Sequence, residues 1–484
     1  MKRWASVAWW ALAMALVGAL PYLNTLESGF TFDDNGLVVL NPYVPAHASL
    51  AAPFVGPSTS GSQYRPLTMV TYLLNHRAGG GPFAFHLTNV ALFGLSTGMA
   101  FLLARALSRS VAVGVGTALV WAVHPIHTEG VASVTGRAEI LAAFWMMAAL
   151  LLLQLRLDAA AGPRRLVAAL GSLAAFAAAL CSKESAAAGV LLVPAVVWLH
   201  TGERWKRSAA LVSLPYAGVA IAFVVARTMA VGVLGQDDIP FVDNPLAYVP
   251  AAVRVATATV VLWEYVGLLT LPFGLSSDYS YDQVPLVASF TDPRLIVGLL
   301  GLQGVAMIAF VCRRDAPLVT FGILFTTAAL AVTANVVAPI GTIKAERLLF
   351  LPSFGWCFAF GWGLAVWIGR PADRWRVAAA SVVLAILAMG TLTRNVDWRD
   401  DYTLLTTTAQ VSPRSARAQA NAGAVLGGAG DLAGAERHFR RALEIHPDYQ
   451  PAWKGLASVL RLSGRPAEAA EAARRAAQAT DVPR

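Results

Sequence analysis

The sequence predicts an all-α protein in which a polytopic helical membrane domain precedes a short solenoid of helical repeats. Of its 484 residues, 57% are hydrophobic and only 13% are charged, which is outside the usual range of soluble globular proteins. Apolar runs of bilayer-spanning length recur through residues 1–397, and a polar pattern with a 34-residue period replaces them in residues 398–484. These two regions are the predicted domains.

The net charge of +9 reflects membrane orientation, and we predict no nucleic-acid partner. Six short loops, counted with Asp315 directly after one of them, hold 15 Lys and Arg against four acids, which is the positive-inside pattern of cytoplasmic loops. These loops are residues 2–3, 105–109, 156–165, 203–207, 313–314 and 370–376. The three cysteines lie far apart in or beside apolar runs, which argues against a disulfide framework or a cysteine metal site. The sequence leaves any metal requirement undetermined.

Eleven membrane spans are predicted, starting from a cytoplasmic N-terminus. The first apolar run, Trp4 to Leu23, is long enough to cross and lacks a small-x-small cleavage site, so we expect a retained helix. The predicted spans lie near residues 4–23, 87–104, 111–124, 138–155, 166–181, 186–200, 209–230, 295–312, 317–338, 349–369 and 377–394. Large outer loops are expected at about 24–86 and 232–294.

Whether the segment from Pro250 to Leu271 crosses the membrane determines on which side all later loops lie. It is apolar and nominally long enough to cross, but Arg254 and Glu264 each cost roughly 2.5 to 3.5 kcal/mol near a helix centre. A crossing would also move the later basic loops outside. We therefore predict an interfacial or re-entrant helix, which places the C-terminus outside.

The C-terminal region has the pattern of tetratricopeptide repeats. An offset of 34 residues aligns small residues where paired helices touch, namely Gly430 with Gly464, Ala435 with Ala469 and Ala442 with Ala476. About two and a half repeats are predicted, enough to bury a continuous core and to present a groove of peptide size.

Two adjacent acids, Asp33 and Asp34, follow the first span directly. Carboxylates are poorly placed for spanning the bilayer and well placed to accept a proton at its edge, so this pair is the predicted reactive centre. The alternative is the start of an ordinary solvated loop.

Other ionisable residues fall on the same predicted side as the acid pair, at outer helix ends or in the first outer loop. They are Arg65, His86, His124, His127, Glu129, Arg137, Lys183, Glu184, Lys344, Glu346 and Arg347. The alternative roles are structural: Lys183 with Glu184 and Glu346 with Arg347 could be ion pairs that secure helix ends. His124 and His127 could likewise cap a helix.

Several motifs recur along the chain in an order that resembles a known family. They are the acid pair followed by Asn41-Pro42, Tyr64 to Thr68, His86 to Val90, His124 to Glu129 with Gly136-Arg137, Lys183-Glu184, Ala345 to Arg347 and Trp398-Arg399. Together they resemble the transmembrane and tetratricopeptide repeat (TMTC-type) protein O-mannosyltransferases, membrane glycosyltransferases of the GT-C fold. Ser277 to Tyr281 and Thr291 to Pro293 resemble the domain that characterises this family.

The resemblance implies transfer of a sugar, mannose in this family, from a polyprenyl-phosphate donor to a Ser or Thr hydroxyl with inversion. It makes Asp33 the candidate base and Asp34 a supporting acid that binds acceptor or a metal. The implied ligands of the donor phosphate are Lys183, Arg347, Lys344 and Arg137. The implied supporting residues are Arg65, His86, His124, His127, Glu129, Glu184 and Glu346.

The implied partners are a membrane lipid donor and a protein or peptide acceptor bound by the repeats. Few lysines beside abundant Arg and Ala favour a bacterial source, hence an inner-membrane protein with periplasmic repeats. Two alternatives stay open. One is a GT-C transferase of another sugar onto a lipid or glycan, and the other is a non-catalytic membrane-anchored repeat scaffold. The chain has about two repeats where eukaryotic members have many, which bears on the acceptor class.

Overall fold

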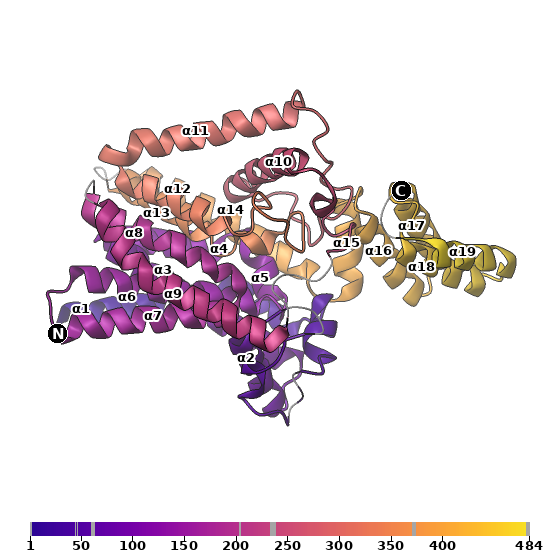
Figure 1. The fold of residues 1–484 in the computed structure, drawn as a ribbon, viewed down its shortest axis with the longest axis horizontal. Coiled ribbons are helices and arrows are strands. Elements are labelled where there is room, and N and C mark those ends of the chain that lie inside the picture. The colour runs from indigo at the N-terminus through magenta and orange to yellow at the C-terminus, as the bar shows by residue number, and fades with distance from the viewer. Residues whose placement is uncertain are drawn as a thin grey trace. The chain divides into compact units, whose positions relative to one another are not determined.

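The computed structural model describes residues 2–43, 45, 47–59, 63–202, 205–232, 239–369 and 374–480 (Figure 1). Within these ranges every regular element is a helix and none is a strand, which confirms the predicted all-α class. The chain forms two compact units. The first unit comprises residues 1–235, 302–333 and 347–396, and the second comprises residues 236–301, 334–346 and 397–484.

The first unit is a bundle of apolar helices around an aromatic core. Its helices are α1 (Lys2–Ala19), α2 (Pro66–Arg77), α3 (Pro82–Ser108), α4 (Val111–Val123), α5 (Thr128–Ala132), α6 (Arg137–Asp158), α7 (Pro163–Ser182), α8 (Gly189–Thr201), α9 (Trp205–Val231), α12 (Pro317–Leu330), α13 (Ser353–Ile368) and α14 (Arg374–Asp397), with most of α11 (Pro293–Asp315). Helix α3 packs against α1, α4 and α6, and α13 packs against α4 and α12. Phe93, Trp121 and Phe354 are fully buried between them.

Local sequence explains how these helices start and how closely they pack. Proline, which needs no amide partner in a first turn, begins α2, α3, α7 and α12. A Cβ on Gly116 would lie 2.9 Å from the carbonyl oxygen of Gly361. Helices α4 and α13 therefore approach closely only because neither residue carries a side chain, a packing device common between membrane helices.

A multi-pass membrane organisation agrees with the helix lengths. Among the described residues, nine helices are long and apolar enough to cross a membrane. A tenth candidate joins α4 to residues 125–132 across a bend of 57° at His124, and α12 and α13 are shorter apolar helices. Helices thus occur at all eleven predicted spans.

One helix end differs from the prediction, and one helix keeps the ambiguity that its sequence showed. Helix α12 ends at Leu330 although we predicted a span to residue 338. The amides of Ala331 and Thr333 donate to carbonyls three residues back, which are turn contacts, and Asn335 then adopts a φ of 57°. Helix α10 (Ala251–Thr270) has the length and composition of a span, so the side of the later loops depends on this one helix.

The second unit contains the repeats. Its helices are α10, α15 (Asp401–Val411), α16 (Ala416–Gly428), α17 (Leu432–Ile445), α18 (Gln450–Leu462) and α19 (Pro466–Gln478). Helices α16 to α19 form two hairpins whose turns place Gly430 and Gly464 at φ values of 89° and 72°, a conformation that favours glycine. Helix α15 packs on α16 as half of a further unit. The predicted repeats are confirmed.

The outer segment before the repeats packs with them in the second unit. Phe241 and Val242 share a hydrophobic core with Ala416 and Ala420 of α16. Arg417 pairs with Asp278 at 2.5 Å and also with Asp243. Burial lowers the pKa of the Arg417 guanidinium, but these two carboxylates outweigh it and raise the pKa. The described residues from 239 to 301 therefore cluster in the same compact unit as the repeats.

Candidate active site

A tight turn presents the two adjacent acids differently. The amide of Asp34 donates to the carbonyl of Thr31 at 2.9 Å, and the amide of Thr31 donates to Asp34 Oδ2 at 3.2 Å. Phe32, inside this turn, adopts a φ of 49°, which is uncommon for a residue with a side chain. As a result Asp34 is fully buried, while the side chain of Asp33 remains partly exposed.

Asp34 ties the first outer loop to the turn before α6. Its Oδ1 accepts hydrogen bonds from Ser133 Oγ at 3.0 Å and from the amide of Thr135 at 2.8 Å. Burial raises the pKa of this carboxyl from 3.8 to about 6, although the hydrogen bonds oppose the shift. In this arrangement Asp34 fixes the position of its neighbour and is closed off from solvent.

The buried Asp34 predicts a specific pH dependence of stability. Between pH 4 and 6 the folded state keeps the proton that the unfolded chain has lost, so the unfolding free energy should fall by about 3 kcal/mol as the pH rises. Asp34→Asn removes this titration, but it turns an amide donor toward the Thr31 N–H and should cost about 1–3 kcal/mol. Melting curves of both proteins in detergent across this range test the prediction, and equal pH slopes would contradict it.

Three buried or half-buried ion pairs form among the predicted site residues of the first unit and their partners. Arg65 Nε donates to Glu184 Oε2 at 3.0 Å, and Lys183 pairs with Glu139 of α6. Burial lowers the pKa of the Lys183 ammonium, and the Glu139 carboxylate opposes that change. Lys183 does not pair with Glu184, as the sequence had suggested. Its backbone is extended (φ −159°, ψ 139°), and successive side chains of an extended chain point in opposite directions.

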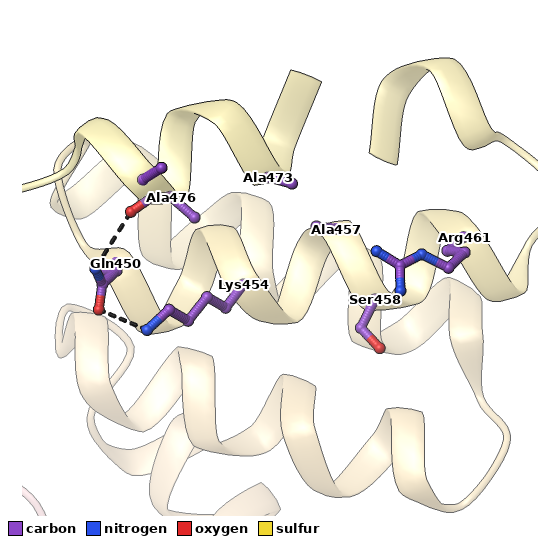
Figure 2. A pocket seen from close by; sticks show the side chains of 8 residues that line it. Gln450, Lys454, Ala457, Ser458, Arg461, Ala473 and Ala476 are labelled. Atoms are coloured by element: carbon purple, nitrogen blue, oxygen red, sulfur yellow. Dashed lines mark hydrogen bonds between the residues drawn. The ribbon is translucent and has the colours of Figure 1, made fainter. Parts of the chain in front are cut away.

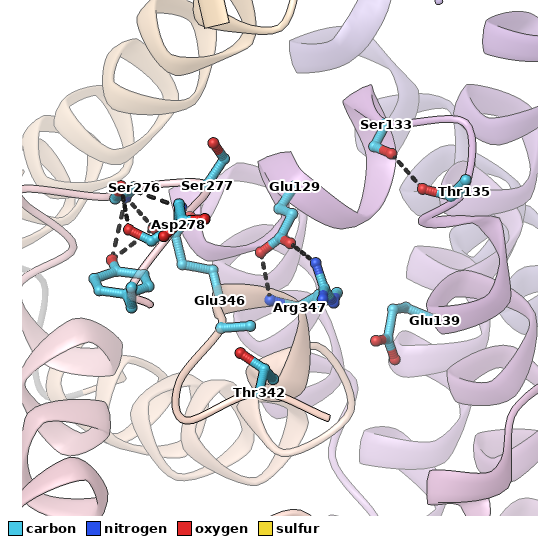
Figure 3. A network of polar contacts seen from close by, with 12 residues as sticks. Glu129, Ser133, Thr135, Glu139, Ser276, Ser277, Asp278, Thr342, Glu346 and Arg347 are labelled. Carbon is cyan, nitrogen blue, oxygen red and sulfur yellow. Dashed lines mark hydrogen bonds and ion pairs between the residues drawn. The ribbon is translucent and has the colours of Figure 1, made fainter. Parts of the chain in front are cut away.

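The third pair joins Arg347 to Glu129 (Figure 3). Arg347 Nη1 donates to Glu129 Oε1 at 2.7 Å, and the Arg347 amide donates to Oε2 at 2.8 Å. Burial lowers the pKa of the guanidinium, but Glu129 and, more weakly, Asp33 outweigh it and raise the pKa. Nε and Nη2 donate to no residue that the structure describes, and 34% of the side chain is exposed. Part of the guanidinium can therefore bind an anionic ligand.

Among the acids of this group, Asp33 is the one that forms no hydrogen bond or ion pair with any residue that the structure describes. Glu129, Glu139 and Glu184 each bind a cation, whereas no hydrogen bond or ion pair to Asp33 occurs within the described ranges. Its carboxylate is nevertheless close enough to Arg347 to raise the pKa of that side chain. A partly exposed carboxylate with open lone pairs is what a general base requires.

Arg137 has a structural environment. It is fully buried, and its guanidinium lies 4.8 Å from the centre of the Tyr72 ring. Its donors are used by Asn89 Oδ1 at 2.7 Å, Asn75 Oδ1 at 2.6 Å, Thr71 Oγ1 at 3.3 Å and the carbonyl of Phe85 at 2.9 Å. These contacts tie α2 and α3 to α6, and a donor phosphate would have to displace them.

The three histidines are likewise held by protein groups. His124 Nδ1 accepts from the amide of Ile126 at 3.2 Å, so the capping role considered for it is confirmed. The other ring contacts are His127 Nδ1 with the Trp121 carbonyl at 2.9 Å, His127 Nε2 with Ser353 Oγ at 2.8 Å and His86 Nε2 with the Gly29 carbonyl at 3.1 Å. All three rings therefore contact groups of the protein itself.

Lys344 and Glu346 belong to the second unit. Lys344 Nζ donates to Glu264 Oε2 at 2.8 Å and lies 4.4 Å from the centre of the Tyr279 ring. Glu346 accepts from the Tyr279 hydroxyl at 2.9 Å and from the amide of Ser276 (Figure 3). The structure therefore assigns the predicted donor cations to two units, with Lys183, Arg347 and Arg137 in the first.

Sequence reasoning missed Glu139 and Glu264 as partners of the two lysines. An acid in the first turn of an apolar helix was the available signal for Glu139, since such a charge needs a partner. In the part of the chain that the structure describes, no group of three or more His, Cys, Asp or Glu side chains could hold a metal ion.

Comparison with known families supports the sequence-based resemblance. Residues 240–306 match the family model described as protein O-mannosyl-transferase TMTC, DUF1736, and residues 428–484 match a tetratricopeptide repeat.

Similar proteins in three animals are named protein O-mannosyl-transferases. The chain is 28% identical to protein O-mannosyl-transferase Tmtc3 of Drosophila melanogaster, over 88% of this chain and 54% of the relative. It is 26% identical to F38B6.6 of Caenorhabditis elegans, over 91% and 63%, and 27% identical to human TMTC1, over 95% and 58%. The chain thus spans between half and two thirds of the length of these relatives.

Proposed function

The chain is related to the TMTC-type protein O-mannosyl-transferases over 88–95% of its length, and on that premise we propose that it is a membrane protein O-mannosyltransferase. It takes mannose from a polyprenyl-phosphate donor and transfers it to Ser or Thr hydroxyls of exported proteins. The reaction takes place at the periplasmic face of a bacterial inner membrane. The observation that carries this proposal is the unpaired, partly exposed carboxylate of Asp33 among three paired acids.

The mechanism is a single displacement. The acceptor hydroxyl attacks the anomeric carbon of mannose while Asp33 takes its proton, because a neutral hydroxyl is a poor nucleophile. The bond from the anomeric carbon to the phosphate oxygen breaks, and the polyprenyl phosphate leaves with the bonding electrons. The configuration at the anomeric carbon is inverted. No covalent sugar–enzyme intermediate is needed.

Cations near Asp33 stabilise the leaving phosphate. Arg347 offers Nε and Nη2, which have no partner among the described residues, while Glu129 orients the guanidinium through Nη1. Preoriented donors of this kind stabilise charge that develops during the reaction. Lys183, which pairs with Glu139 in the structure, is the second cation assigned to the leaving phosphate. Asp34 holds the turn that carries the base.

The repeats supply a surface for the acceptor. A cavity of about 340 Å³ lies between α18 and α19, with an alanine floor formed by Ala457, Ala473 and Ala476. Figure 2 shows Lys454, which donates to Gln450, toward one end of this cavity and Arg461 at the other end, both on α18. The size and the two cations suit an extended peptide with acidic side chains, which favours a protein acceptor over a lipid.

A transfer assay tests the proposed function. Purified full-length protein is incubated with polyprenyl-phosphate mannose and Ser- or Thr-containing peptides, and the intact mass of each peptide is measured. We expect the addition of one hexose, and none on matched peptides in which Ala replaces Ser and Thr. Addition of the hexose to lipid or glycan instead would favour the other GT-C specificity, and no transfer to any acceptor would favour a scaffold.

The proposed face of the membrane predicts a topology. Eleven spans from a cytoplasmic N-terminus place the repeats outside, so a phosphatase reporter fused after Thr480 should be active. A fusion at Gly162 should be silent because its loop lies among the predicted cytoplasmic basic loops. If both fusions are silent, α10 crosses the membrane and the repeats are cytoplasmic, which contradicts the proposal.

A further inference from the structure

A cavity of about 610 Å³ lies wholly within the second unit, beside α10 and the chain that follows it. Its lining includes the apolar side chains of Trp263, Leu271 and Phe273 and the polar side chains of Glu264, Gln283 and Lys344. A volume of this size is typical of a site for a small molecule or for part of a lipid. Except for Lys344, these residues fall inside the family-specific region 240–306, which the catalytic proposal does not use.

The polar side chains that line this cavity include one charge of each sign. Lys344 is only 8% exposed and donates to Glu264 at 2.8 Å, while the Glu264 side chain is 39% exposed. These two are the charged side chains among the described residues that line the cavity. A purely anionic ligand would meet the carboxylate as well as the ammonium. A ligand that carries one negative and one positive group would complement both.

The apolar wall indicates a hydrocarbon chain. Leu271 and Phe273 follow the end of α10 and are 64% and 72% exposed. Large neighbouring apolar side chains with such exposure mark a surface that contacts a membrane or another apolar partner. Helix α10 has the length and composition of a membrane helix, so a membrane lipid is the apolar partner that suits this wall.

We propose that this cavity binds a zwitterionic phospholipid with a primary ammonium, as in phosphatidylethanolamine. The lipid phosphate binds Lys344, the ammonium binds Glu264 and an acyl chain lies along Leu271 and Phe273. A primary ammonium donates hydrogen bonds to the carboxylate, whereas the quaternary ammonium of phosphatidylcholine has no N–H to donate. This inference is independent of the transferase proposal and assigns Lys344 to a lipid other than the sugar donor.

Native mass spectrometry of the full-length protein tests the proposal. The delipidated protein receives equimolar phosphatidylethanolamine, phosphatidylcholine and phosphatidylglycerol with identical acyl chains, and the retained lipids are counted. We expect about tenfold preference for phosphatidylethanolamine over phosphatidylglycerol, since one charge-assisted hydrogen bond is gained and one repulsion avoided. Equal retention of these two lipids by the wild type would overturn the proposal.

Charge variants make the test specific. Lys344→Met should lose about tenfold in phosphatidylethanolamine retention, and Lys344→Arg should keep it. Glu264→Gln should shift the preference toward phosphatidylglycerol, because the cation is then left alone. The exposed Lys206→Met is the matched control and should change nothing. If Lys344→Met lowers only the melting temperature and leaves the lipid preference intact, the ion pair is purely structural and the proposal fails.

A competition arm separates a lipid from a soluble ligand with the same headgroup. Free phosphoethanolamine in large excess should not displace the bound lipid, because it lacks the chain that contacts Phe273. Phe273→Ser should weaken retention of all three lipids without changing their order. Displacement by free phosphoethanolamine at concentrations similar to those of the lipid would overturn the assignment to a membrane lipid.

Discussion

Asp33→Asn is expected to lower the turnover number by about 10³-fold, the typical contribution of a general base. The amide keeps the shape of the side chain but cannot accept the hydroxyl proton. The melting temperature should stay close to that of the wild type, because Asp33 makes no hydrogen bond or ion pair with any residue in the described ranges. Turnover with saturating donor and peptide, measured beside a melting curve, checks both parts.

Asp34→Asn is the neighbouring control for this prediction. It changes the same chemical group one residue away, but its main effect should be on stability, since Asp34 is buried and bound by Ser133 and Thr135. Near-normal turnover of Asp33→Asn would move the base elsewhere. Glu129 is the next candidate, although it would first have to release Arg347.

Arg347→Lys is expected to raise the apparent KM for the donor by about tenfold or more. The guanidinium can bind Glu129 through one nitrogen and a phosphate through the other two, whereas an ammonium acts as a point charge and cannot keep this geometry. Donor dependence of turnover for Arg347→Lys and Glu129→Gln, beside their melting curves, is the measurement. Lower melting temperatures with an unchanged donor KM and an unchanged turnover number would show that the pair is structural only.

Lys183 needs a paired design because its removal leaves a buried acid without a partner. Lys183→Met should destabilise the protein by several kcal/mol, since Glu139 is only 7% exposed. The double variant Lys183→Met with Glu139→Gln removes that charge and should recover most of the stability. If the donor KM of the double variant equals that of the wild type, Lys183 takes no part in donor binding. The melting curve of Glu184→Gln measures how much the separate Arg65–Glu184 pair contributes to stability.

The fold could be predicted from the sequence wherever one local pattern determines the structure. Apolar runs located the helices, and the offset of 34 residues located the hairpin turns at Gly430 and Gly464. The predicted end of α12 was wrong because residues 331–338 are apolar enough to continue a helix. In the structure the helix ends at Leu330, and Asn335 beyond it has a positive φ. Apolarity alone does not define where a helix ends.

The candidate site could be predicted as a set of residues but not as a set of contacts. Adjacent charges in Lys183-Glu184 suggested a local pair, whereas their partners, Glu139 and Arg65, lie 44 and 119 residues away in the sequence. Arg137 was grouped with the donor cations, since a sequence cannot show that four protein acceptors already use its donors. The local sequence can show that a buried charge needs a partner, but it does not show which distant residue tertiary packing supplies.

The anomeric configuration of the mannosylated peptide tests the central claim most directly. The claim is that Asp33 deprotonates a Ser or Thr hydroxyl for one direct displacement at the anomeric carbon. Nuclear magnetic resonance of the purified product gives the configuration of the new bond, for comparison with that of the polyprenyl-phosphate donor. We predict the opposite configuration, formed by the wild type and lost in Asp33→Asn. Retention of the donor configuration would require a covalent sugar–enzyme intermediate and would contradict the mechanism.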